Sequence, residues 1–159
     1  MTTIKRVKNG TKVIMGQLDR NTYNGIENRI QLFDGQFTTG YRITKFVISP
    51  STPASADNTA SELYSLLSTE PKSQLGYWHW NDIEQLAWAA WNPTYGGRHG
   101  TYSELRPENM VVEDLYIQTY TPEDVNWMFN YMIVLEKYEF TAWDGAAVLV
   151  RNQSQAGPT

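Results

Sequence analysis

Short apolar segments, each closed by turn-forming residues, recur along the chain, and their spacing limits the fold class. The segments are rich in β-branched and aromatic residues, which favour strands. The residues between them are mostly Gly, Pro, Asn, Asp and Ser, which favour turns. Strands are predicted over residues 11–18, 29–33, 41–48, 110–120 and 127–140. The last of these is the longest, and we expect it to lie in the centre of a sheet.

Two further segments fit more than one structure. Residues 61–68 fit a helical stripe as well as a strand, but only about eight residues fit before Pro71, and this length favours a strand. Residues 82–91 are apolar at alternate and at intervening positions, as in a strand that is buried on both faces. We therefore expect a strand in both places, the second ending at Asn92-Pro93.

The connecting segments carry turn and capping signals. Asp34-Gly35 is typical of a β-hairpin, because glycine supplies the positive φ of a tight turn. Residues 96–100 are expected to form a flexible loop. Thr121 and Thr141 each begin a pattern that caps a short helical turn, although the segment after Thr141 also fits a last strand.

Seven or eight strands without alternating helix–strand units favour an all-β fold, an antiparallel β-sandwich that is jelly-roll-like and has one or two short helical turns. A chain of 159 residues is expected to form one domain. The predicted division is a basic N-terminal arm over residues 1–12, a single sandwich domain over 13–155 and a tail over 156–159.

Composition argues against several function classes. The chain has no cysteine, hence no disulfide, thiolate metal site or cysteine nucleophile. His79 and His99 are its two histidines, and they lack the spacing of a metal-binding motif. Phosphate-binding and common hydrolase motifs are absent from the sequence. We expect a protein that is not an enzyme and that holds no cofactor or metal. A small hydrolase is the remaining enzymatic alternative, with a carboxylate pair brought together by the fold.

Charge is distributed unevenly along the chain. The net charge is −4, which gives no general attraction to nucleic acid or to a membrane. Residues 1–50 nevertheless carry +5 and residues 101–159 carry −6. The expected arm holds four bases, Lys5, Arg6, Lys8 and Lys12. We expect it to dock on an acidic surface of a neighbouring subunit; the alternative is a solvated terminus.

Aromatic residues are concentrated in the middle of the chain, where four of the six tryptophans lie within residues 78–91. The candidate binding residues are Tyr77, Trp78, Trp80, Tyr95 and Tyr102. Such a cluster fits core packing, a protein interface, or a platform on which sugar rings stack. Trp88 and Trp91 are expected to belong to the core.

Five segments together resemble a known family. They are 40–50 (GYRITKFVISP), 84–92 (EQLAWAAWN), 110–116 (MVVEDLY), 131–136 (YMIVLE) and 150–155 (VRNQSQ). In their order and spacing they resemble small virion structural proteins of marine tailed bacteriophages. The resemblance implies a capsid decoration, cement or appendage protein that is made in the host bacterial cytoplasm and built into the virion. Its partners would be further copies of itself and major capsid or tail proteins. The alternative is a carbohydrate-binding module of a host-recognition appendage.

Overall fold

The computed structural model describes residues 5–19, 29–36, 38–51, 62–71, 78–94, 98–121 and 128–140, which contain eight strands and no helix. The strands are β1 (Lys5–Asp19), β2 (Arg29–Ile30), β3 (Thr39–Pro50), β4 (Leu63–Ser68), β5 (Gln85–Thr94), β6 (Arg98–Leu105), β7 (Leu115–Tyr120) and β8 (Met128–Glu139). All of their pairings are antiparallel. The predicted all-β antiparallel sandwich is therefore confirmed. The helical turns expected after Thr121 and Thr141 fall outside the described residues.

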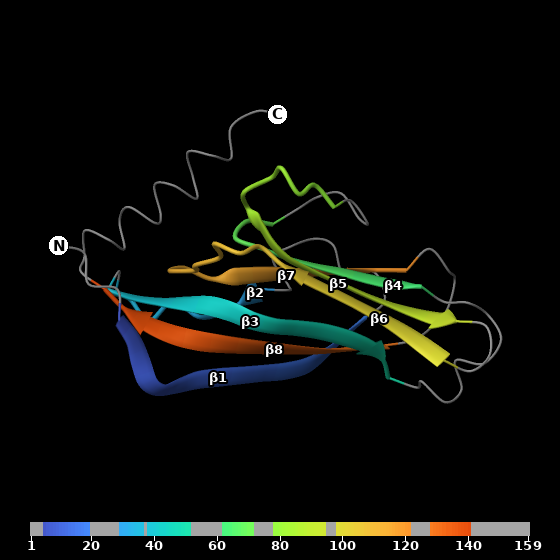
Figure 1. Ribbon diagram of the computed structural model, residues 1–159, viewed down its shortest axis with the longest axis horizontal. Helices are drawn as coiled ribbons and strands as arrows, with labels where there is room; N and C mark the ends of the chain where they lie inside the picture. The colour runs from blue at the N-terminus through green and yellow to red at the C-terminus, as the bar shows by residue number, and fades with distance from the viewer. Residues whose placement is uncertain are drawn as a thin grey trace.

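The strands form two layers (Figure 1). One sheet has three strands in the order β1-β8-β3, and the other has five in the order β2-β7-β4-β5-β6. β8 is 12 residues long and pairs with β1 on one side and β3 on the other. The expectation of a long central strand in this part of the chain is confirmed.

The hydrophobic core lies between the sheets. Alternate residues of each strand point inward, so each sheet contributes one face. The three-stranded sheet contributes Ile43, Phe46, Ile48, Phe129, Ile133 and Leu135, and the five-stranded sheet contributes Leu63, Leu67, Ala87, Ala89, Trp91, Leu115 and Ile117. Burying one large apolar side chain of this kind stabilises a fold by about 1.5–3 kcal/mol.

The two ambiguous segments are both strands. In β5, Leu86, Ala87, Ala89 and Trp91 belong to the core cluster, while Trp88 is buried outside that cluster. This strand is thus buried on both faces, as its continuous apolar sequence predicts. β5 runs past Asn92 to Thr94. The register with β4 ends at Trp91, so Pro93 has a strand partner on one side and its missing N–H is tolerated.

The prediction of a loop over residues 96–100 is wrong for residues 98–100, which belong to a strand. β6 begins at Arg98, and Arg98, His99 and Gly100 pair with Thr94, Pro93 and Asn92. The β6 sequence is polar and contains glycine, so it lacks the apolar alternation that marks a strand. Its strand conformation follows from backbone pairing with the apolar strand β5.

The hairpin predicted at Asp34-Gly35 is also wrong, although the turn itself is present. Gly35 has φ = 88°, and the Asp34 carboxylate accepts a hydrogen bond of 2.9 Å from the backbone N–H of Gln36. The strands on either side are not partners, since β2 pairs with β7 and β3 pairs with β8. The turn therefore carries the chain from one sheet to the other.

The strand predicted over residues 110–120 is shorter than expected. Val111 makes an isolated bridge to Tyr41, and β7 begins at Leu115. Asp114 is the last residue before β7. Its carboxylate accepts hydrogen bonds from the backbone N–H groups of Leu32 (2.9 Å) and Phe33 (3.1 Å). This contact attaches the segment before β7 to the segment after β2.

Both edges of the three-stranded sheet are irregular. The pairing of β1 with β8 shifts in register between Arg6 and Thr11, and that of β3 with β8 shifts between Ile43 and Lys45. β1 begins at Lys5, so residues 5–12 of the expected N-terminal arm belong to a sheet strand.

Candidate binding surfaces

An aromatic cluster lies on the outer face of the five-stranded sheet. The register aligns Tyr64 of β4, Ala90 of β5 and Tyr102 of β6 in one row across the sheet. Leu66, Trp88 and Glu104 form the next row. Leu66 and Trp88 are buried although neither belongs to the core between the sheets. A further segment therefore covers this face.

The described part of the covering segment comprises residues 78–84. The Trp78 ring stacks on Tyr102, with ring centroids 5.8 Å apart and an interplanar angle of 21°. Its contact with Tyr64 is edge-to-face, also at 5.8 Å. Trp80 lies on Trp88 at 5.6 Å. Offset and edge-to-face contacts at these distances stabilise aromatic pairs beyond simple burial.

Arg106 fastens this segment to the sheet. Its guanidinium donates hydrogen bonds of 2.8 Å to the backbone carbonyls of Trp80, Asp82 and Gln85. It also lies 5.4 Å from the Trp88 ring centroid, a cation–π contact. Burial lowers the pKa of Arg106 from its usual value, and the nearby Asp82 opposes that shift.

Gln85 provides a second attachment for the covering segment. Its side-chain oxygen accepts hydrogen bonds from the His79 backbone N–H (2.8 Å) and from the indole N–H of Trp88 (3.0 Å). Trp88 is thus buried beneath the segment, on the face of β5 that points away from the core. Trp91 lies in the core between the sheets, as expected.

Three of the five predicted aromatic binding residues are described and lie in this cluster. Trp80 is 58% exposed and Tyr102 39% exposed, whereas Trp78 is half-buried. Tyr77 and Tyr95 lie outside the described residues. The cluster also contains Tyr64 and Arg106, which the sequence analysis did not select. Tyr64 is the single aromatic residue of segment 61–68, and no local pattern marks Arg106.

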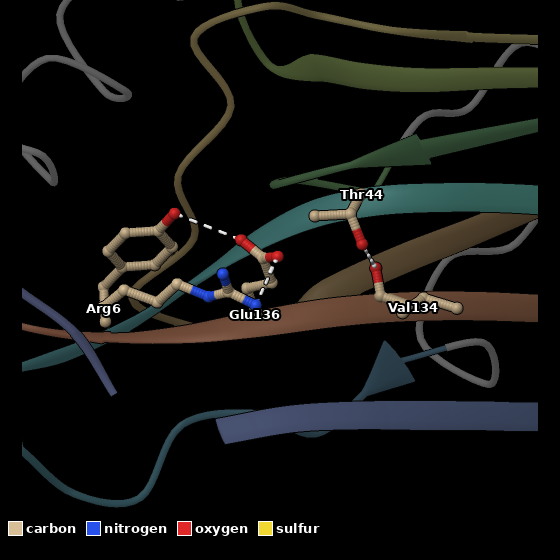
Figure 2. Close-up of polar contacts among 5 residues, drawn as sticks. Arg6, Thr44, Val134 and Glu136 are labelled. Carbon is tan, nitrogen blue, oxygen red and sulfur yellow. Dashed lines mark hydrogen bonds and ion pairs between the residues drawn. The ribbon is translucent and has the colours of Figure 1, made fainter. Parts of the chain in front are cut away.

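The four predicted basic residues lie along β1, and two of them, Arg6 and Lys12, contact side chains within the chain. Arg6 forms an ion pair of 2.9 Å with Glu136 of β8 (Figure 2), and Glu136 also accepts a hydrogen bond from the Tyr138 hydroxyl. The Lys12 ammonium lies 5.8 Å from the Tyr41 ring centroid. Lys5 is exposed, and the side chain of Lys8 lies outside the described part of the structure.

A second candidate surface is the outer face of the three-stranded sheet. Val13 is 49% exposed, Met15 70% and Met128 41%, and half-buried Met132 and Val47 lie in register with Met15. A shallow depression of about 410 Å³ lies beside them. At one end the apolar strip meets a polar row in which Gln17 donates a 2.8 Å hydrogen bond to Asn130. At the other end it meets the Arg6–Glu136 ion pair.

The described acidic residues mostly support the fold. Asp114 binds backbone N–H groups and lies 3.6 Å from Arg29, and Glu136 is paired with Arg6. Among the described residues, no group of three or more His, Asp and Glu side chains could hold a metal ion. The same part of the chain contains no helix with the length and apolar character needed to cross a membrane.

No protein-family model matches the chain, and no curated protein matches it.

Proposed function

We propose that the chain is a non-enzymatic structural subunit of a virus particle, a capsid decoration, cement or appendage protein that binds copies of itself and neighbouring capsid or tail subunits. The observation that carries this proposal is the outer face of β1-β8-β3. Exposed Val13 and Met15, with half-buried Met132 and Val47 beside Met15, form an apolar strip on this face, and contiguous exposed apolar surface commonly marks an interaction site. Methionine side chains adapt their shape to a partner surface.

The resemblance of five sequence segments to small virion proteins of marine tailed bacteriophages supports the particle as the location. In this proposal the chain is made in the bacterial cytoplasm and then incorporated into the virion, without nucleic acid or membrane as a partner. The ion pair of Arg6 with Glu136 lies at one end of the apolar strip, where charges mainly orient an encounter.

The test is native mass measurement of the purified chain at micromolar concentration, with particle incorporation measured in parallel. We expect a symmetric oligomer, three-fold or five-fold, or retention on the particle. Met15→Glu should abolish the association, because it places a charge in the centre of the strip. Gln31→Glu adds the same charge at an exposed position elsewhere and serves as the control. A strictly monomeric chain that does not associate with particles would refute the proposal.

The second candidate function is a carbohydrate-binding module of a host-recognition appendage. The exposed indole of Trp80, which is supported from below by Trp88, favours it, because a flat apolar ring stacks on the face of a pyranose. Trp78 is not equally open, since Tyr102 stacks on it. The measurement is binding of the full chain to an array of glycans, with Trp80→Ala as the variant that should lose binding.

A further inference from the structure

A depression of about 260 Å³ lies at the edge of the aromatic cluster, on the outer face of the five-stranded sheet. Ala90, Asn92 and Gly100 line it where β5 and β6 run side by side, and Tyr64 and Tyr102 border it. Ala90 has a small side chain and Gly100 has none, which leaves space beside Tyr64 and Tyr102, whose rings each also contact Trp78. Pockets with apolar and aromatic linings and a few polar groups are the usual form of small-molecule sites.

The polar groups beside this depression include both hydrogen-bond donors and acceptors. The Tyr64 hydroxyl donates to one Glu62 oxygen at 2.6 Å, and the Asn92 side-chain amide donates to the other at 3.4 Å. Within the described residues, the Asn92 side-chain oxygen accepts no hydrogen bond, and the Tyr102 hydroxyl has no partner. Glu62 thus orients the Tyr64 hydroxyl and the Asn92 amide, while the Asn92 oxygen and the Tyr102 hydroxyl retain bonding capacity for a ligand.

We infer that this depression binds one neutral hexopyranose ring, with a sugar C–H face against the Tyr64 or Tyr102 ring and vicinal hydroxyls on Asn92 and Glu62. A sugar hydroxyl both donates and accepts hydrogen bonds, so it matches a carboxylate, an amide and a phenol together. An organic cation requires acceptors and aromatic faces alone and would leave the donors unused. Glu62 and Glu104, which lies two residues from Tyr102 along β6, disfavour acidic sugars by charge repulsion.

This inference rests on the second candidate function, carbohydrate binding, and places the sugar-binding site at this depression. Trp88, beneath Trp80, and Asn92 are four residues apart along β5, which corresponds to about 13 Å at the usual rise of a strand. An oligosaccharide can therefore contact the Trp80 indole and place its terminal ring in the depression. The two contacts are separable by mutation because they lie in different rows of the sheet.

The experiment is saturation-transfer NMR and titration of the full chain with the methyl pyranosides of glucose, galactose and mannose. Glucuronic acid and tetramethylammonium serve as the acidic and cationic probes. We expect saturation transfer to the ring protons of at least one neutral pyranoside and none to glucuronic acid. Asn92→Ala and Glu62→Gln should each weaken binding by about tenfold, since the first removes a polar contact and the second replaces a charged acceptor by a neutral amide. Asn130→Ala and Glu113→Gln, on other surfaces, should leave it unchanged.

The outcomes distinguish a failure of the carbohydrate-binding function from a failure of the depression as its binding site. Glycan binding that Trp80→Ala abolishes but Asn92→Ala and Glu62→Gln do not affect would keep the carbohydrate-binding role and overturn the assigned depression. Absence of binding to the glycan array and to all pyranosides would overturn both. Binding of tetramethylammonium in preference to neutral sugars, with loss in Glu62→Gln, would identify a cation pocket and overturn the inference.

Discussion

The guanidinium of Arg106 lies 5.4 Å from the ring centroid of Trp88, while its N–H groups bond the backbone that passes over the same ring. One side chain thus connects β5, the turn after β6 and the segment that carries Trp78 and Trp80. Residues 78–84 of the covering segment lie outside the strands, so hydrogen bonds from Arg106 and to Gln85 hold this described part against the sheet.

Replacing Arg106 by methionine should destabilise the protein by about 2–3 kcal/mol, since three carbonyls lose a charged donor. Chemical denaturation measures the loss, and acrylamide quenching should show greater exposure of the tryptophans. Arg42→Met is the matched control. Arg42 makes one 3.3 Å bond to the Pro107 carbonyl from an exposed position, and its loss should cost less than about 1 kcal/mol. Equal effects from the two substitutions would contradict the role given to Arg106.

Gly16 of β1 leaves room for the Tyr131 ring. A Cβ at Gly16 would lie 2.6 Å from the Tyr131 hydroxyl oxygen and 2.7 Å from its Cζ. Gly16→Val should therefore displace this half-buried ring and destabilise the fold by about 1–3 kcal/mol. The double variant Gly16→Val with Tyr131→Ala should recover part of the loss, as measured by urea denaturation. If Gly16→Val alone is neutral, the ring does not pack over the strand in this way.

The phenol of Tyr64 should titrate at a higher pH than that of an ordinary tyrosine. Burial and its hydrogen bond to Glu62 raise the pKa of Tyr64 to about 12 from the usual value of 10.0. Because the pKa is raised in the folded state, the associated stability is present below pH 10.0 and is lost as the pH rises towards about 12. Phenolate absorbance measures this titration. Tyr64→Phe should remove one late-titrating group, and an unchanged titration curve would contradict the assignment.

The bases of the N-terminal segment should affect association through charge. Replacing Lys5, Arg6, Lys8 and Lys12 by glutamine should weaken binding to neighbouring subunits at low salt and have little effect at high salt, because exposed ion pairs are screened. Sedimentation velocity at two ionic strengths measures the difference. Arg6→Gln alone is the control for the loss of the ion pair to Glu136 within the chain. Normal assembly of the four-fold variant at low salt would show that these bases do not contact a partner.

Most of the strands could be predicted from the sequence, because their stability depends on apolar side chains that the local pattern displays. β8 and β5 are examples, since β8 buries Phe129, Ile133 and Leu135, and β5 is buried from Gln85 to Ala89 and at Trp91. β6 could not be predicted in this way. Its residues are polar, and its conformation follows from a backbone ladder with β5. Asp34-Gly35 correctly predicts a turn. The two residues do not specify which strands pair on either side of it, because strand pairing is decided by the tertiary fold.

The aromatic cluster was predictable in part. Trp78, Trp80 and Tyr102 could be selected by residue type, because exposed aromatic side chains are common in binding sites. Tyr64 and Trp88 join them only through the lateral register of β4, β5 and β6. Arg106 lies more than twenty residues from the backbone groups it binds in the covering segment. Such contacts arise from the tertiary fold and leave no periodic signal in the sequence.

The register shifts of β1 and β3 affect how the molecule behaves at high concentration. A straight, regular edge strand is a template on which another molecule can add a strand and begin a fibril. Here both edges of the three-stranded sheet are interrupted, and Lys12 of β1 directs its charge towards Tyr41. An approaching strand would meet a break in the ladder on either side. The sheet can therefore expose apolar side chains on its outer face while resisting amyloid-like polymerisation along its edges.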